Sequence, residues 1–230
     1  MRESHAKQGP ETRSRILDAA ERLFMEHGFD GTSMRMITGS ANVNLAAVNY
    51  HFGSKDALIQ EVFTRRLTAM NKERLAALDA LLEASGGEPL KPSRIVEAFF
   101  GTSLEMAADN DNGGYIFMRL LGRTYTEPNS FVRQFIAEEY SECTGRFLAE
   151  LYRSLPGVPR DEILWRFHFM MGATSYAIAG TDALQLFAGK FDDSDPARLV
   201  PRLMSFLLGG LRGPLPEFQE ELPVEHRNAA

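Results

Sequence analysis

Apolar residues recur every three or four positions along most of the chain, which is the spacing of amphipathic helices. The first such stripe runs through Ile16, Leu17, Ala20, Leu23 and Phe24. Further stripes predict helices over 34–41, 45–52, 55–84, 92–109, 114–126, 129–154, 160–188 and 195–212. The sequence lacks the alternating pattern of a half-buried strand. The pattern therefore predicts an all-α fold.

Glycine and proline mark where the first helix begins and ends. Gly9 and Pro10 open it, because proline suits the first helical position, and Gly28 closes it. The polar residues 1–8 are expected to be disordered.

The longest predicted helix, 55–84, is followed by the break Ser-Gly-Gly-Glu-Pro. We therefore expect a small head over 9–54 and a larger helical bundle over 55–212. The last segment, 213–230, holds three prolines and mixed charge and is expected to be a disordered tail.

The short helix 45–52 has two dissimilar sides. Asn44 precedes it as a good N-cap, and Val48 and Phe52 make one inward stripe. Two turns are too few for a stable isolated helix, so neighbouring helices must hold it. Its other side displays an amide, a phenol and an imidazole: Asn49, Tyr50 and His51. Such a display predicts contact with nucleic acid.

Charge is divided unevenly along the chain, whose formal net charge is −6. Residues 1–75 hold 11 Lys and Arg against 9 Asp and Glu, and the remaining residues hold 14 against 22. The acid therefore lies in the second part. A local basic face, not a basic domain, is what phosphate binding requires.

The sequence contains no residue pattern that indicates a catalytic site or a metal site. Cys143 is the only cysteine, which excludes an intrachain disulfide and a thiolate zinc cluster. The five histidines are scattered, and neither an HExxH motif nor a glycine-rich phosphate loop occurs. We therefore expect no enzyme activity, no metal and no cofactor.

Apolar runs are broken by charge or glycine well before the roughly 18 residues needed to cross a bilayer. The polar start does not resemble a signal peptide. The sequence thus predicts a cytoplasmic protein with no membrane partner.

The turn Ala41-Asn42-Val43 joins two short predicted helices, as in a helix-turn-helix. Asparagine suits this turn because it tolerates the left-handed backbone conformation. The surrounding residues resemble the DNA-binding signature of TetR-family transcriptional repressors: Gly28-Phe29, Thr32-Ser33, Ile37, Ala41-Asn42-Val43, Tyr50-His51-Phe52, Ser54-Lys55 and Leu58. The sequence departs from the common pattern at Asn42, at Leu45-Ala46 and at Asn49.

The resemblance implies a three-helix head that binds a double-stranded DNA operator. Tyr50, His51 and Lys55 match the family's phosphate-contacting positions, and Thr32 and Ser33 would act in the same way at the helix before. For base reading the resemblance and the chemistry favour Arg35, Ala46, Ala47 and Asn49. Asn44, as the cap of the reading helix, completes the predicted DNA-binding set.

Each of these residues also has a simpler interpretation. Tyr50 could be a half-buried aromatic and His51 a cap at the helix end. Arg35 could be one more solvated arginine on a helix surface.

Large apolar side chains are abundant over 92–188, and polar groups lie among them. Arg119 lies in YIFMRLLGR and His168 in WRFHFMMG, where either could hold the head group of an amphipathic anion. The predicted ligand-binding residues are Phe99, Met106, Phe117, Arg119, Leu120, Arg123, Phe167, His168 and Met171.

The alternative is that these apolar side chains only fill a core. Arg119 or Arg123 would then pair with Glu138 or Glu139, and His168 would be a core histidine.

The runs VNLAAVNYHFGSKDALIQEVF, IFMRLLGR and WRFHFMMGA resemble the fatty-acid-responsive, PsrA-like branch of TetR regulators. That resemblance implies a repressor of a pseudo-palindromic operator, released when a small hydrophobic effector such as a long-chain fatty acid or acyl-CoA binds. Two alternatives stay open. One is a TetR-type regulator of another apolar or aromatic ligand, such as a drug-efflux inducer, and the other is a helical adaptor that does not bind DNA.

Small and apolar residues recur along the last two predicted helices, 160–188 and 195–212: Ala173, Ala177 and Gly180, then Leu199, Leu203, Phe206, Leu207 and Gly210. Close packing of these helices from two subunits predicts a four-helix homodimer interface, as in TetR proteins. Alternatively, the same faces close the subunit's own core.

Overall fold

A computed structural model of the chain describes residues 3–109, 111–125, 129–179 and 196–217. Within these ranges all regular structure is helical, which confirms the predicted all-α fold class. The helices are α1 (Glu3–Gly31), α2 (Met34–Ala41), α3 (Leu45–Phe52), α4 (Lys55–Ala84), α5 (Pro92–Ala108), α6 (Gly114–Thr124), α7 (Ser130–Ser154), α8 (Arg160–Ala179) and α10 (Pro196–Arg212). None of these helices combines the length and the apolar character needed to cross a membrane.

The start of α1 differs from the sequence-based expectation. The helix begins at Glu3, so Pro10 lies inside it and residues 3–8 are helical, not disordered. Proline removes a single backbone donor, and most of residues 3–8 are good helix formers. At the other end Gly28 has φ 75° and ψ 173°, so the regular helix breaks there as predicted.

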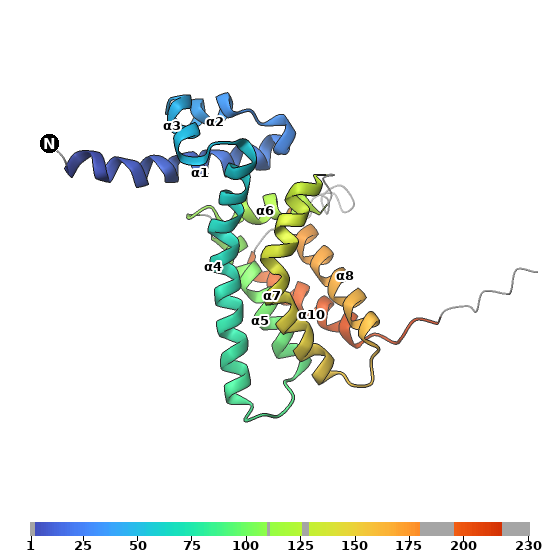
Figure 1. The fold of residues 1–230 in the computed structure, drawn as a ribbon. Helices are drawn as coiled ribbons and strands as arrows, with labels where there is room; N and C mark the ends of the chain where they lie inside the picture. The colour runs from blue at the N-terminus through green and yellow to red at the C-terminus, as the bar shows by residue number, and fades with distance from the viewer. Residues whose placement is uncertain (1–2, 110, 126–128, 180–195, 218–230) are drawn as a thin grey trace, which may run out of the picture.

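Helices α1, α2 and α3 form a small head at one end of the molecule, and α4 leads from it along a bundle of α5, α7, α8 and α10 (Figure 1). The head core consists of apolar residues spaced for one helical face: Ile16, Leu17, Ala20 and Phe24 of α1, Ile37 of α2, and Val48 and Phe52 of α3. Helix α3 is therefore held by its neighbours.

A continuous series of aromatic rings joins the head to the bundle. The Phe24 and Phe29 ring centroids lie 5.5 Å apart, and Phe29 lies 6.1 Å from Phe63 of α4. Phe63 in turn lies 5.8 Å from Phe117 of α6. All four side chains are buried, and tilted aromatic pairs at these distances attract one another beyond their burial. The series of rings therefore runs from α1 by way of Phe63 to α6.

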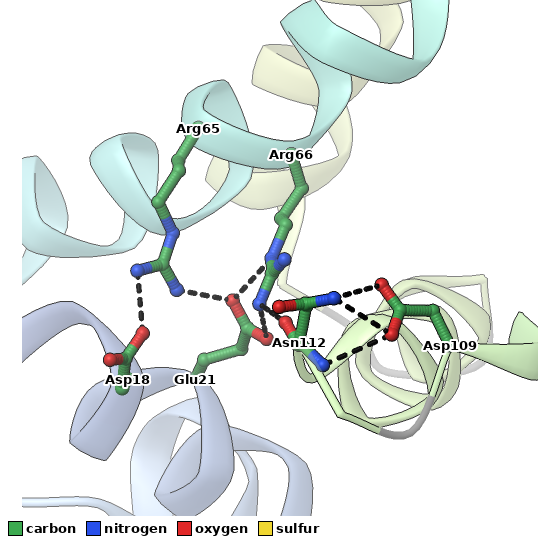
Figure 2. A network of polar contacts seen from close by, with 6 residues as sticks. All are labelled: Asp18, Glu21, Arg65, Arg66, Asp109 and Asn112. Atoms are coloured by element: carbon green, nitrogen blue, oxygen red, sulfur yellow. Dashed lines mark hydrogen bonds and ion pairs between the residues drawn. The ribbon is translucent and has the colours of Figure 1, made fainter. Parts of the chain in front are cut away.

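A buried carboxylate adds a polar connection at the same junction (Figure 2). The Glu21 side chain of α1 is 3% exposed and accepts hydrogen bonds from Arg65 Nη2 at 2.7 Å and Arg66 Nη2 at 3.0 Å. Arg65 Nη1 also donates to Asp18 Oδ1 at 2.6 Å. A carboxylate this deeply buried requires charged partners, and two arginines of α4 provide them.

The same network reaches the loop before α6. Arg66 Nη2 donates to the carbonyl oxygen of Asn112 at 2.7 Å, and the Asn112 backbone N–H donates to Asp109 Oδ1 at 3.0 Å. That backbone hydrogen bond is the main reason that the pKa of Asp109 lies below its ordinary value. Arg66 therefore links the head to the α5–α6 connection.

We predict that Glu21→Gln lowers the free energy of unfolding by about 1.5 to 3 kcal/mol, because the partly buried Arg66 loses its anion and Arg65 keeps only the exposed Asp18. Urea denaturation measures the change. The control is Glu97→Gln, which removes the same charge from the exposed Arg94–Glu97 pair and should change stability by less than about 1 kcal/mol. Equal effects of the two substitutions would contradict a structural role for the buried pair.

Candidate functional site

Helix α3 presents one face to solvent at the end of the head. Val48 is buried and Phe52 nearly so, whereas Asn49 is exposed and Tyr50 is 86% exposed. The half-buried His51 ring meets the Tyr50 ring edge-on at 5.3 Å. The alternative interpretation of Tyr50 as a half-buried aromatic is therefore wrong, and a phenol and an amide project together from the protein.

Local hydrogen bonds define the two helices and the turn between them. Ser33 Oγ accepts from Met36 N at the start of α2, and Asn44 Oδ1 accepts from Ala47 N at 2.8 Å at the start of α3. Asn42 has φ 51° and ψ 52°, the left-handed conformation that its residue type predicts. These are the elements of a helix-turn-helix.

Two arginines of α1 donate hydrogen bonds to the end of α2 and to the turn that follows it. Arg15 Nη2 donates to the carbonyl oxygen of Asn42 at 3.0 Å and also to that of Ala41. Arg22 Nη2 donates to Ser40 Oγ at 2.7 Å. These contacts attach the end of α2 and the turn before α3 to α1.

All but one of the predicted DNA-binding residues are exposed or half-buried on the head and at the start of α4. Exposed members are Ser33, Arg35, Asn44, Ala46, Asn49 and Tyr50, and half-buried members are Ala47, His51 and Lys55. Lys55 opens α4, where Ser54 Oγ accepts from Ala57 N at 3.1 Å. The N-termini of α2 and α4 and the charge of Lys55 are suited to phosphate oxygens.

Thr32 is the exception, and the prediction that its hydroxyl contacts DNA is wrong. The residue is 1% exposed. Its Oγ1 donates towards the carbonyl oxygens of Gly28 at 2.8 Å and Leu23 at 3.0 Å. The hydroxyl therefore closes the end of α1 and is not available to a ligand.

A pocket of about 500 Å³ opens between the end of α6, α7 and α8. Its lining combines apolar side chains with a few hydroxyl groups: Thr124, Tyr125, Arg133, Ile136, Ala137, Tyr140, Thr144, Leu164, Phe167, His168, Met171 and Gly172. Three predicted ligand-binding residues, Phe167, His168 and Met171, are among them. His168 is exposed, so the alternative interpretation as a core histidine is wrong.

Other predicted ligand-binding residues lie elsewhere. Arg119 and Arg123 line a second pocket of about 550 Å³ beside Met25 and Tyr176. The Arg119 guanidinium lies 5.6 Å from the centroid of the Tyr115 ring, and Arg123 Nη1 donates to the Met25 carbonyl oxygen at 2.6 Å. Arg123 therefore connects α6 to the head.

Four apolar residues of the predicted set belong to the protein core or its margin. Phe99, Phe117 and Leu120 are completely buried, and Met106 is half-buried against the core. The Phe99 ring packs at about 5 Å from the rings of Phe147 and Phe167. For these four residues the core interpretation is correct.

A buried arginine near the pocket lies outside the predicted ligand-binding set. Arg74 of α4 is 1% exposed, and its Nε donates to the Phe99 carbonyl oxygen at 2.9 Å. Its guanidinium carbon lies 5.4 Å from the centroid of the Tyr140 ring, and Tyr140 lines the pocket. The signal was available, because Arg74 continues the inward stripe of Leu67 and Met70 by one more turn.

Large apolar side chains, most of them aromatic, are exposed on the adjacent helices α8 and α10. They are Leu164, Trp165, Phe169, Tyr176 and Phe206, each at least half exposed. We call this set the aromatic face. By contrast, Leu203 and Leu207 are buried within the subunit, as the alternative interpretation held. Gly180 and the rest of 180–195 lie outside the described residues.

Metal ligands do not cluster in the described ranges: no group of three or more His, Cys, Asp or Glu side chains lies close enough to hold an ion.

Comparison with known proteins identifies both parts of the chain. Residues 16–62 match the profile of "Bacterial regulatory proteins, tetR family", and residues 97–210 match "Tetracyclin repressor-like, C-terminal domain". Among curated proteins, the probable regulator YttP of Bacillus subtilis is 33% identical over 79 residues, 34% of this chain and 38% of that protein. The regulator UidR of Escherichia coli K12 is 45% identical over 51 residues, 22% of this chain and 26% of that protein. The matches thus span well under half of these two relatives.

Solved structures show the same fold at low identity. The fatty acid degradation regulator FadR from Bacillus halodurans superposes with a TM-score of 0.63 at 15% identity, covering 87% of this chain and 96% of that one. FadR from Bacillus subtilis in complex with stearoyl-CoA gives 0.60 at 16% identity, covering 86% and 98%. A regulator from Saccharomonospora viridis in complex with choline gives 0.56 at 18% identity, covering 86% and 96%.

The helix-turn-helix geometry of the head and the two family profiles agree across most of the chain's length. The chain belongs to the TetR family of bacterial transcriptional regulators.

Proposed function

We propose that the protein is a cytoplasmic repressor that binds a pseudo-palindromic operator as a homodimer and is released by a hydrophobic effector, a long-chain fatty acid or its CoA thioester. The proposal rests on one observation: the same chain has an exposed polar face on α3 of the head and an apolar pocket within the helical bundle. Each part of the proposal rests on a separate set of contacts.

The proposed operator contacts follow from the exposed chemistry of the head. Helix α3 has the dimensions to enter a major groove, where the Asn49 amide can pair with adenine and Ala46 can touch a thymine methyl group. Tyr50, Ser33 and Lys55 would contact phosphates and fix the register. One two-turn helix reads few base pairs, so two heads about one helical turn apart on a palindromic site give the required specificity.

The proposed dimer forms through the aromatic face. Five large apolar side chains exposed on two adjacent helices are unusual for a surface in water. Trp165 and Phe169 already pack together, with ring centroids 5.6 Å apart. Both helices lie largely within the matched C-terminal family profile. A second copy of the chain, related by a two-fold axis, would bury this face against itself.

The proposed effector occupies the pocket between α6, α7 and α8. The lining is mainly apolar, which suits an acyl chain, and FadR from Bacillus subtilis holds stearoyl-CoA in a similar fold. Apolar burial gains roughly 0.8 kcal/mol per CH₂ group, so chain length should dominate the affinity.

Helix α6 provides a path from the pocket to the head. Thr124 at its end and the adjacent Tyr125 line the pocket, while Phe117 and Arg123 of α6 connect to α4 and α1. An effector that binds better to a displaced α6 would favour a conformation in which α1 and α4 reposition the head. The two heads would then no longer match the half-site spacing.

Operator reading predicts a difference between two head residues. Asn49→Ala should cost roughly 1 to 3 kcal/mol on the selected operator and little on random DNA, because it removes a base contact. Lys55→Ala should weaken binding to all DNA sequences. It should also reduce the slope of log affinity against log salt concentration by about 2 per dimer, because each subunit loses one phosphate contact. Fluorescence anisotropy over a salt series, on a site selected from random DNA, measures both.

The control for Lys55→Ala is Lys72→Ala, an exposed lysine farther along α4 whose loss should leave DNA binding unchanged. If the protein selects no sequence from random DNA, or if Lys55→Ala and Lys72→Ala behave alike, the proposed operator surface is wrong.

Dimerisation predicts that Phe169→Asp yields a monomer, because a carboxylate would have to be buried at the centre of the interface. Operator affinity should fall by at least roughly 100-fold as the second head is lost. Sedimentation velocity measures the oligomeric state. Phe131→Asp, an exposed aromatic on α7 outside the aromatic face, is the control. A dimeric Phe169→Asp protein would place the interface elsewhere.

Acyl-chain binding predicts that affinity for saturated fatty acids rises about fourfold per added CH₂ group until the pocket is full. Ala137→Trp should fill the pocket and abolish binding of the longest chains, whereas Ala149→Trp on the same helix should not. Isothermal titration provides the affinities. Affinity that is independent of chain length would exclude an acyl effector and favour a compact apolar or aromatic ligand.

A further inference from the structure

The positive charge of Arg74 is buried without an anion. Its guanidinium donates to three neutral oxygens: the Phe99 carbonyl at 2.9 Å, Asn71 Oδ1 at 3.3 Å and Ser103 Oγ at 2.5 Å. In the part of the chain that the structure describes, no carboxylate lies within ion-pair distance of it. An isolated buried charge is costly, and a counter-ion is the usual remedy.

Aromatic rings cover two sides of this guanidinium but do not neutralise it. Its central carbon lies 3.9 Å from the Phe99 ring centroid and 5.4 Å from that of Tyr140. Cation–π contacts of this kind offset part of the desolvation cost and leave the net charge in place. The charge of Arg74 therefore remains beside the Tyr140 ring, and Tyr140 lines the pocket.

Tyr140 offers a second unsatisfied group at the same place. Its side chain is 6% exposed and lines the pocket, yet the proton of its hydroxyl has no acceptor among the described residues. Burial raises the pKa of Tyr140, while the charge of Arg74 and a contact between its guanidinium and the phenol oxygen only partly oppose this, so the phenol stays protonated at neutral pH. A buried hydroxyl proton without an acceptor is uncommon and indicates that one is missing.

We propose that Tyr140 and Arg74 form an anion subsite at the inner wall of the pocket, which holds the free carboxylate of an apolar ligand. The Tyr140 hydroxyl donates to the carboxylate, and the carboxylate neutralises the buried charge of Arg74. The apolar part of the ligand then lies along Phe167, Met171 and Leu164 towards the opening. This assignment rests on the proposed function, replaces Arg119 and His168 as head-group residues, and selects the free acid over its CoA thioester.

A purely structural Arg74, clamping α4 to α5 through Phe99 and Ser103, makes a different prediction. The pocket would then distinguish ligands by shape and apolar surface alone. A fatty acid and the alcohol of the same chain length would bind equally. Ligand charge therefore separates the two roles.

The first experiment compares dodecanoate, 1-dodecanol and dodecanoyl-CoA on the full wild-type chain by isothermal titration. We expect dodecanoate to bind about 10- to 100-fold more tightly than dodecanol, as hydrogen bonds to charged groups imply. Equal affinities of acid and alcohol would overturn the anion subsite and leave the proposed acyl effector intact. Tighter binding of the CoA thioester than of the acid would also overturn it. Failure of all three to bind would overturn the proposed effector class together with the subsite.

The second experiment uses Tyr140→Phe, which keeps the ring and removes only the hydroxyl. We expect dodecanoate affinity to fall about 10-fold or more while dodecanol affinity stays the same. The control is Tyr152→Phe on the same helix, whose ring lies 5.1 Å from Arg160 and outside the pocket lining. An unchanged acid-to-alcohol ratio in Tyr140→Phe would overturn the assignment. Arg74→Met should abolish the preference for acid, but it also removes three core hydrogen bonds, so Tyr140→Phe is the primary variant.

Discussion

A two-turn helix has too few hydrogen bonds to be stable by itself, and the rest of the head depends on this constraint. Only Val48 and Phe52 attach α3 to the core, so its outer face is free for polar side chains. The orientation of α3 depends on residues outside the helix. Asn42 sets the direction of the turn before it, and Arg15 of α1 binds the carbonyl oxygen of Asn42. The position of the reading surface therefore depends on the helices that surround α3.

The junction between the head and the bundle combines two different kinds of interaction. The rings of Phe29, Phe63 and Phe117 provide packing that tolerates small sliding movements, whereas the hydrogen bonds around Glu21 require particular distances and directions. The series of rings ends on α6 and the hydrogen bonds reach the loop before it, while the far end of α6 borders the ligand pocket. A regulator needs such a connection, because a ligand in the bundle can act on DNA only through contacts that differ between two conformations.

Local chemistry made much of the head predictable from the sequence. The caps Ser33 and Asn44 and the left-handed Asn42 are decided by neighbouring backbone atoms, and the structure has α2, α3 and α4 with the predicted bounds. The role of Thr32 does not follow from the sequence, because a hydroxyl beside a helix start can face either solvent or the preceding helix, and only tertiary packing decides. The sequence also does not show the early start of α1, because Pro10 indicates a helix boundary.

The bundle was less predictable, since core and pocket use the same residue types. Phe99 and Phe167 have equivalent sequence environments, yet one lies in the packed interior and the other also lines an opening. Arg74 was overlooked because arginine is normally solvated, although its helical position points inwards. The aromatic face was likewise hidden: helical spacing shows that Phe206 and Leu207 point in different directions, but not which of the two faces water.

The depth of the Glu21 carboxylate has a consequence for measurements in salt. In 0.1 M salt, dissolved ions reduce the potential of an exposed charge over a distance of about 10 Å. They cannot approach a carboxylate that is 3% exposed. Added salt should therefore leave the junction between the head and the bundle largely intact. It should weaken the contacts between the protein and the DNA phosphates. The decrease of DNA affinity with ionic strength would therefore report the number of phosphate contacts. Weakening of the junction between the head and the bundle would contribute little to it.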